Sequence, residues 1–220
     1  MFVKICGTTT EEDALLAVAM GADAVGFILA PSKRQVTAET VADIVKRLPP
    51  EILSVAVFRN ERADRVVEIA LRTNVRGVQL HGEERPEDVA LIRSKLPLVT
   101  IKVFPAGSAE VRRADAYGAH VTMLDAPSPG SGQVFDWRLA EGVPDGVRLL
   151  LAGGLDPGNV ADAIEAVHPW GVDVATGVEA APGRKDPRKL RAFVEAAKAA
   201  SPPRYHGSGP GPYDWQDEWR

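Results

Sequence analysis

The chain alternates short apolar runs with longer amphipathic segments, and this alternation constrains the fold more than any other feature. Eight apolar runs have the length of buried strands, namely 2–5, 24–29, 53–58, 77–80, 98–104, 120–124, 147–151 and 172–175. Between them, apolar residues recur at the three- and four-residue spacing of one helix face. Strands that alternate with helices are typical of parallel sheets with crossover helices. Eight such units predict an α/β fold, a (β/α)8 TIM barrel, with an open doubly wound sheet as the alternative.

Capping residues and prolines mark where the helices should begin. Threonine, serine and aspartate before an amphipathic segment can cap a helix, and proline suits its first turn. The candidate helix starts are Thr10, Thr37, Pro86, Ser108, Asp136, Asp156 and Asp186.

The last twenty residues differ in composition from the rest. Seven proline and glycine residues stand between positions 202 and 212, where they break any helix or strand. We therefore expect a single catalytic barrel domain over residues 1–200 and a flexible, disordered tail over 201–220.

Charge and cysteine content limit the classes of partner. A net charge of −4 argues against a nucleic-acid binder, although a small anionic ligand remains compatible with it. No segment approaches about 18 consecutive apolar residues, so no membrane partner is expected. Cys6 is the only cysteine, which gives no sign of an oxidising compartment. We expect a cytoplasmic protein, monomeric or homodimeric, that binds a small molecule.

Reactive side chains stand at the ends of the first and sixth apolar runs. In a barrel of this type the active site lies at the carboxyl ends of the strands. Lys4 and Cys6 share one strand face, so a charged Lys4 would lower the pKa of the thiol. Asp125 closes an apolar run, where a carboxylate is costly unless it is paired, exposed or functional. The alternatives are that Cys6 is a small buried hydrophobe and that Asp125 only caps a turn.

Glycine-containing turns follow the seventh and eighth runs. Ala152-Gly153-Gly154-Leu155 and Ala175-Thr176-Gly177-Val178 can present backbone N–H groups, which bind phosphate without basic side chains. Phosphate sites recur after these two strands in such barrels. The alternative is that the glycines only provide the positive φ that a tight turn requires.

Three further residues are weaker candidates for the same pocket. Arg34 follows the second run and can hold a carboxylate, with a solvated basic turn as the alternative. Gln79 and His81 share a face at the end of the fourth run. The four histidines have no metal-ligand spacing, and no dinucleotide fingerprint, Walker loop or nucleophile elbow is present.

The ordered set of motifs over residues 1 to about 200 resembles the phosphoribosylanthranilate isomerase family of tryptophan biosynthesis. The motifs are Lys4-Ile5-Cys6-Gly7, Gln79-Leu80-His81-Gly82, Asp125 with Gly130-Ser131-Gly132, Phe135-Asp136-Trp137, Gly153-Gly154-Leu155 and Gly177-Val178-Glu179.

The resemblance implies an Amadori rearrangement of N-(5′-phosphoribosyl)anthranilate to 1-(2-carboxyphenylamino)-1-deoxyribulose 5-phosphate. It implies that Cys6 is the general base, Asp125 the general acid, and Arg34 the partner of the anthranilate carboxylate. No cofactor or metal is implied, because the substrate nitrogen serves as the electron sink. The expected substrate-binding set is Arg34, Gln79, His81, Gly153, Gly154, Asp173, Thr176 and Gly177.

Two other functions remain compatible with the motifs. The isomerase of histidine biosynthesis performs the same chemistry on a larger aminoaldose, but it carries an aspartate where Cys6 stands and has two phosphate-binding halves. A non-catalytic phosphosugar-binding barrel would need neither Cys6 nor Asp125. A turnover assay separates the three.

Overall fold

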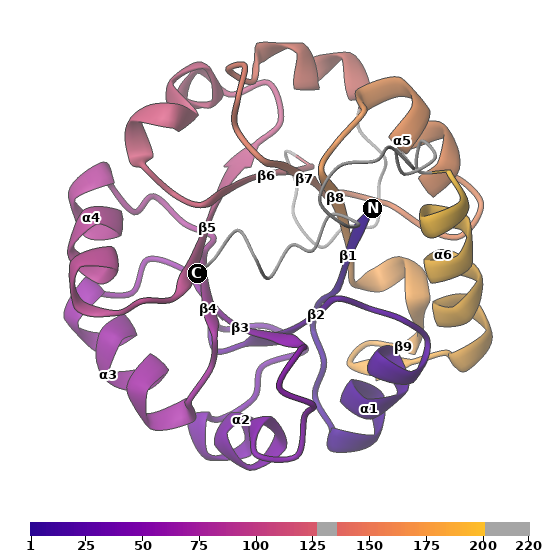
Figure 1. Ribbon diagram of the computed structural model, residues 1–220, viewed down its shortest axis with the longest axis horizontal. Coiled ribbons are helices and arrows are strands. Elements are labelled where there is room, and N and C mark those ends of the chain that lie inside the picture. The colour runs from indigo at the N-terminus through magenta and orange to yellow at the C-terminus, as the bar shows by residue number, and fades with distance from the viewer. Residues whose placement is uncertain (127–135, 201–220) are drawn as a thin grey trace, which may run out of the picture.

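The computed structural model describes residues 1–126 and 136–200. Within this part, eight parallel strands close a barrel in chain order, and β1 completes it by pairing with β8. Helices form a ring outside the strands (Figure 1), so the predicted (β/α)8 TIM barrel is confirmed. The strands are β1 (Phe2–Ile5), β2 (Ala24–Ile28), β3 (Leu53–Phe58), β4 (Gly77–Leu80), β5 (Val99–Pro105), β6 (Val121–Asp125), β7 (Leu149–Leu151) and β8 (Gly171–Val174).

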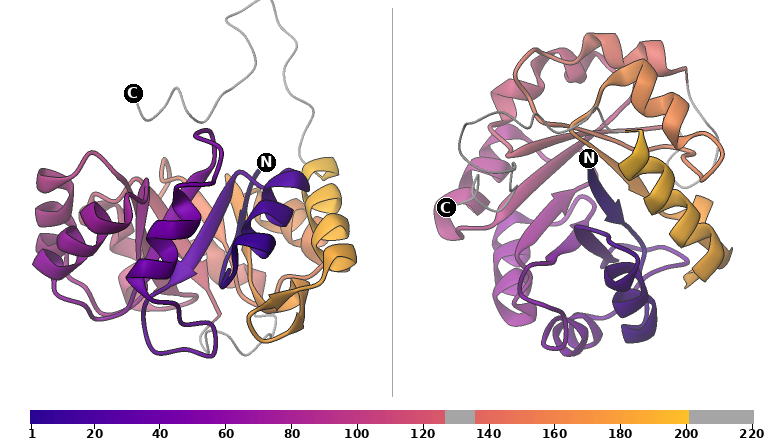
Figure 2. Two further views of the ribbon diagram at one scale, coloured as in Figure 1. Left: turned by 90° about the horizontal axis from the view of Figure 1, so that it is seen from below. Right: turned by 45° about the vertical axis from the view of Figure 1, so that its right-hand side comes forward.

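Each strand divides its side chains between two buried layers. On β1, Val3 and Ile5 belong to the apolar layer under the helices, whereas Phe2 belongs to the barrel interior. Lys4 points inward as well, because its ammonium pairs with Asp173 across the β1–β8 register. The strand arrows in Figure 2 run toward the same end of the barrel, so the residues that follow the strands gather there.

The helical crossovers begin largely where the sequence predicts. Thr10, Thr37 and Asp186 each accept a backbone N–H at a helix start, and Pro86 lies in the first turn of α4. The α-helices are α1 (Glu11–Ala19), α2 (Ala38–Val45), α3 (Ala63–Thr73), α4 (Pro86–Lys95), α5 (Val160–Val167) and α6 (Pro187–Ala199).

Three crossovers differ from a simple α-helix at the expected start. The segments after β5 and β6 are 3₁₀ helices, η1 (Ala109–Tyr117) and η2 (Trp137–Gly142), and η1 is broken at Arg113. Ser108 precedes η1 without a side-chain cap. Asp156 does not begin α5: its Oδ1 accepts the N–H groups of two following residues, which forms a turn and delays the helix to Val160.

A short hairpin between β8 and α6 was not predicted. It joins β9 (Glu179–Ala181) to β10 (Arg184–Lys185) in antiparallel pairing, after the 3₁₀ turn η3 (Thr176–Val178). Pro182-Gly183 is the turn signal that could have predicted it, because Gly183 has φ +81°.

Two predictions lie outside the described residues: the tail over 201–220 and the loop that follows Asp125. The domain boundary at residue 200 therefore stays a prediction. No helix in the described ranges is long and apolar enough to span a membrane.

Candidate active site

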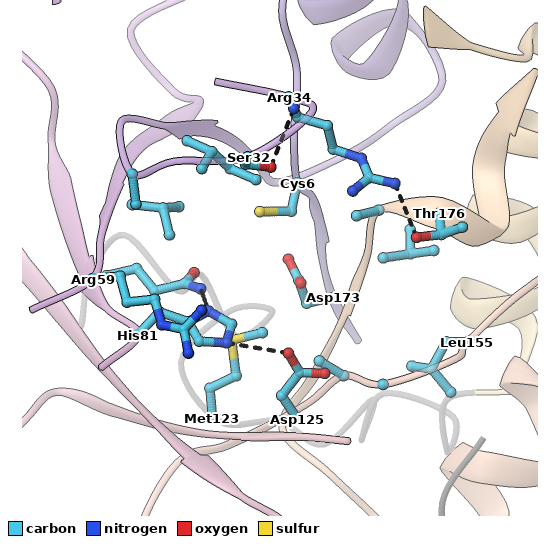
Figure 3. A pocket seen from close by; sticks show the side chains of 18 of the residues that line it. Cys6, Ser32, Arg34, Arg59, His81, Met123, Asp125, Leu155, Asp173 and Thr176 are labelled. Atoms are coloured by element: carbon cyan, nitrogen blue, oxygen red, sulfur yellow. Dashed lines mark hydrogen bonds and ion pairs between the residues drawn. The ribbon is translucent and has the colours of Figure 1, made fainter. Parts of the chain in front are cut away.

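A cavity of about 230 Å³ opens at the carboxyl ends of the strands, where the sequence places the site. Figure 3 shows Cys6 and Asp125 on opposite sides of it, with Asp173 between them. All of the predicted site residues line this cavity: Cys6, Arg34, Gln79, His81, Asp125, Gly153, Gly154, Asp173, Thr176 and Gly177.

Cys6 lies among charged groups that are themselves buried. Lys4 is fully buried, and its Nζ lies 2.7 Å from Oδ1 of Asp173. Sγ of Cys6 and Nζ of Lys4 approach Gly26 so closely that a Cβ there would lie 3.0 Å from both atoms. Lys185 reaches the same strand end from β10, and its Nζ donates to the Cys6 carbonyl oxygen at 2.6 Å. The thiol therefore has two ammonium groups and one carboxylate as close neighbours.

Lys4 acts on the pKa of the Cys6 thiol in the predicted direction, but burial acts more strongly in the other. Burial raises the pKa of the Cys6 thiol above its usual value, and the carboxylate of Asp173 adds to the rise. Lys4 lowers that pKa, as expected, but by less than burial raises it. Burial alone would lower the pKa of Lys4, yet Asp173 and the thiol together raise it, so Lys4 remains charged. The net rise in the thiol pKa therefore comes from burial, to which the sequence-based expectation about Lys4 did not extend.

Asp125 is nearly buried at the end of β6 and contacts His81. Oδ1 accepts the N–H of Ala126 at 2.8 Å, and Oδ2 lies 3.2 Å from Nε2 of His81. The second contact has ion-pair distance but lacks the alignment of a hydrogen bond. On the other side of the ring, Nε2 of Gln79 lies 3.2 Å from Nδ1 of His81, so Gln79 and Asp125 contact opposite nitrogens of the imidazole.

Arg34 reaches the cavity rim and is held there by two partners. Its Nε and Nη2 donate to the two carboxylate oxygens of Glu179, each at 2.7 Å, and Nη2 also donates to Oγ1 of Thr176 at 3.1 Å. Figure 3 shows the guanidinium on the Cys6 side of the cavity, with its bond to Thr176. An anion can therefore meet Arg34 only on the part of the guanidinium that Glu179 leaves open.

The glycines of the two turns are required by backbone conformation at Gly154, by close packing at Gly177 and by both at Gly153. Gly153 and Gly154 have φ +91° and +70°, and a Cβ on Gly153 would lie 2.6 Å from the Ala126 nitrogen. A Cβ on Gly177 would collide with the carbonyl oxygen of Leu155. The turn after β8 therefore rests directly on the turn after β7, and the two present one continuous backbone surface to the cavity.

Three residues of the site were missed as functional candidates. Arg59 lines the cavity directly after β3 and could have been found by the strand-end rule. Glu179 and Lys185 belong to the unpredicted hairpin, so no strand-end argument reached them. In residues 1–126 and 136–200, no group of three or more histidine, cysteine or acidic side chains is arranged to hold a metal ion.

Comparison with known proteins gives one consistent result. Residues 3–196 match the family model described as N-(5′-phosphoribosyl)anthranilate (PRA) isomerase. The N-(5′-phosphoribosyl)anthranilate isomerase of Desulforudis audaxviator (strain MP104C) is 46% identical over 205 residues, which cover 90% of this chain and 98% of that protein.

Solved structures agree with the sequence comparison. A phosphoribosyl anthranilate isomerase from Thermus thermophilus superposes with a TM-score of 0.85 at 38% identity, covering 90% of this chain and 99% of that one. A second isomerase structure is a complex with reduced 1-(o-carboxyphenylamino)-1-deoxyribulose 5-phosphate; its TM-score is 0.79 at 39% identity, with the same coverage.

Proposed function

This chain belongs to the N-(5′-phosphoribosyl)anthranilate isomerase family, and we propose that Cys6 is its general base and Asp125 its general acid. The enzyme converts N-(5′-phosphoribosyl)anthranilate to 1-(2-carboxyphenylamino)-1-deoxyribulose 5-phosphate in tryptophan biosynthesis. The observation that carries the assignment of roles is the placement of the two side chains on opposite sides of one cavity (Figure 3). A base and an acid so placed can act on two different atoms of one bound sugar.

The substrate phosphate occupies the backbone surface formed by the turns after β7 and β8. Gly153, Gly154 and Gly177 line the cavity without side chains, which allows a phosphate to approach the backbone N–H groups. The anthranilate carboxylate meets Arg34 on the Cys6 side of the cavity. These two anion sites fix both ends of the substrate and leave the sugar between the base and the acid.

The first chemical step opens the sugar ring. Asp125 donates a proton to the furanose ring oxygen, and the bond from that oxygen to C1 breaks. The lone pair of the substrate nitrogen forms a double bond to C1, which gives an iminium. His81, directly after β4, lies with its Nε2 3.2 Å from the Asp125 carboxyl group on the same side of the cavity.

The second step moves the proton that the rearrangement requires. The Cys6 thiolate takes the proton from C2, and the electrons left behind form the C1–C2 double bond and neutralise the iminium. The resulting enolamine becomes the ketone when C1 takes up a proton and the hydroxyl on C2 loses one, so that the C1–C2 double bond is replaced by the C2 carbonyl. Lys4 stabilises the thiolate, and Asp173 pairs with Lys4 while facing the sugar between the two catalytic groups.

A turnover assay with substrate generated in situ tests this function. We expect the enzyme to convert N-(5′-phosphoribosyl)anthranilate and to leave the aminoaldose phosphosugar of histidine biosynthesis unchanged. Turnover of the second substrate alone would overturn the assignment, and binding of the first without turnover would indicate a phosphosugar-binding barrel.

We also propose a cytoplasmic location. The base must be a free thiol, and a reducing compartment keeps Cys6 in that state. Detection of the enzyme in a cytosolic cell fraction would support the location, and its recovery from an oxidising compartment would contradict it.

A further inference from the structure

Arg34 is held in one orientation before any substrate arrives. Three of its five N–H groups are used, two by Glu179 and one by Thr176, and Nη1 has no partner among the described residues. Its stem crosses Gly7, directly after Cys6, where a Cβ would collide with Cδ of Arg34. The stem of Arg34 therefore packs directly against the Gly7 backbone, and the Nη1 side of the guanidinium is the part left for an anion.

Glu179 is itself placed by a buried cation. Its side chain is 4% exposed, and Oε1 lies 3.3 Å from Nζ of Lys185, whose side chain is fully buried. The N–H of Gly183 donates to the same oxygen at 3.2 Å. Burial would raise the pKa of Glu179, but the bond from Arg34 and the charge of Lys185 together lower it, so the carboxylate is ionised. A buried carboxylate between two cations has little freedom to move.

Lys185 connects the Glu179 carboxylate to the ends of β1 and β8 and to α1. Its Nζ donates to the carbonyl oxygens of Cys6 at 2.6 Å and Ala175 at 3.3 Å, at the ends of β1 and β8. Its backbone N–H donates to Asp13 of α1 at 3.0 Å. The β9–β10 hairpin is thus fixed to three elements around Cys6, and Glu179 extends from it toward Arg34.

We propose that Glu179, held by Lys185, is a positioning residue that aims Arg34 at the carboxylate of the substrate and thereby sets the preference for an anthranilate ring. This inference rests on the proposed role of Arg34 as the carboxylate partner. Positioning matters because a guanidinium fixed in advance loses less conformational freedom when it binds its anion.

The test compares two ligands that differ only in the ring carboxylate. One is reduced 1-(o-carboxyphenylamino)-1-deoxyribulose 5-phosphate, and the other is its counterpart made from aniline. Calorimetric titration gives the ratio of their Kd values, which we call the carboxylate preference. In the unaltered enzyme we expect a preference of about 10- to 100-fold, the size of a charge-assisted hydrogen bond.

Glu179→Gln should reduce the carboxylate preference to within about threefold, while the aniline counterpart binds almost unchanged. Glu179→Asp is the second variant, because it keeps the negative charge near Lys185 but shortens the side chain by one methylene. Loss of preference in Glu179→Asp can come only from position, whereas an effect in Glu179→Gln could also come from charge. Equal weakening of both ligands, or an unchanged or larger preference in the folded variants, would overturn the proposal.

Glu84→Gln is the matched control for the loss of a buried ion pair. Glu84 lies 2.9 Å from Lys102, and both side chains are 3% exposed, but neither contacts Arg34. We expect this variant to unfold at a lower temperature and to keep its carboxylate preference. Loss of the preference here would show that the ratio reports destabilisation instead of positioning, and would overturn the proposal.

Arg34→Met separates this inference from the function on which it rests. We expect Arg34→Met to abolish the preference, and Glu179→Gln to change it no further in that background, because Glu179 acts through Arg34. If Arg34→Met keeps the preference, the proposed role of Arg34 fails. If Arg34→Met loses it while Glu179→Asp and Glu179→Gln keep it, only the positioning role fails.

Discussion

The two ends of the barrel interior differ in chemistry although the same strands build both. Along β1 the inward side chains run from Phe2 through Lys4 to Cys6 directly after the strand, and along β6 from Val121 through Met123 to Asp125. Each series begins with an apolar residue and ends with a reactive one. At the amino-terminal end Phe2 stacks on Trp170, with ring centroids 4.4 Å apart.

This difference separates stability from function along a single strand. Apolar side chains at the amino-terminal end are removed from water and stabilise the barrel. At the carboxyl end the buried charges cost desolvation energy, which their ion pairs offset only in part. Replacing the acid or the base at the carboxyl end should therefore lower the rate, and truncating an apolar side chain at the amino-terminal end should lower the free energy of unfolding. Breaking a buried ion pair at the carboxyl end should lower both.

The largest effect is expected from the two catalytic groups. Cys6→Ala and Asp125→Asn should each lower kcat by about 10²–10⁴-fold, the usual contribution of a positioned acid or base. Thermal unfolding should be nearly unchanged, because neither substitution opens a large cavity. Steady-state kinetics beside a melting curve checks both statements, and a variant that keeps near-normal kcat would remove that residue from its role.

The next largest effect is expected when buried charges near the carboxyl end of the barrel are replaced by apolar side chains. Lys4→Met leaves the buried carboxylate of Asp173 without its partner, so it should destabilise the fold by about 3–5 kcal/mol. Adding Asp173→Leu removes the unpaired charge and should recover most of that loss, while activity stays low in both variants. Denaturant unfolding and an activity assay on both variants check this. If the Lys4–Asp173 pair instead stabilised the fold, the double variant would be less stable than Lys4→Met.

A substitution at the apolar end should have the opposite signature. Leu150 is fully buried in the barrel interior, so Leu150→Ala should destabilise the fold by about 2–5 kcal/mol. At a temperature where the variant is folded, kcat and KM should stay within about twofold of the unaltered enzyme. A large loss of kcat in the folded variant would show that the two ends are coupled.

The smallest effect concerns His120, which precedes β6 at the amino-terminal end. Its Nδ1 accepts the N–H of Thr100 at 3.0 Å, and burial, together with Arg93 and Arg148, lowers its pKa from 6.5 to about 4. Between these values the unfolded chain binds more protons, so this part of the stability is present above about pH 6.5 and lost as pH falls through 4.

His120→Asn isolates this contribution. The free energy of unfolding should decrease from pH 7 to pH 5 in both proteins, but the decrease should be smaller in the variant. The expected difference is about 1 kcal/mol once solvent screening of a half-buried group is included. An identical fall in the two proteins would assign the acid sensitivity to other groups. The kcat/KM at neutral pH should not change.

The sequence predicts the barrel and the residues of its mouth because both follow from local rules. Apolar runs identify strands, and the residue after each run then falls at the catalytic end, as Cys6 and Asp125 do. The hairpin that carries Glu179 and Lys185 escapes these rules, because its two strands are very short and its contacts reach across the chain to Cys6 and Arg34.

The electrostatic state of the thiol also lies beyond sequence reasoning. Strand alternation places Lys4 beside Cys6, but the net pKa depends on how much water each group loses and on Asp173, which arrives from the last strand. The 3₁₀ helix after β5 could not be predicted either. Its break at Arg113 coincides with no proline or glycine in the sequence.

The identity of the base can be tested by comparing two titrations of the same enzyme. Cys6 is the only cysteine, so thiolate absorbance, corrected with the Cys6→Ser variant, follows this group alone. Because burial raises its pKa, the thiolate should form above the usual thiol value of about 8.5, and kcat/KM should rise with pH along the same curve. A kcat/KM that reaches its plateau while Cys6 is still protonated, or a rise that persists in Cys6→Ser, would contradict the assignment of Cys6 as the base.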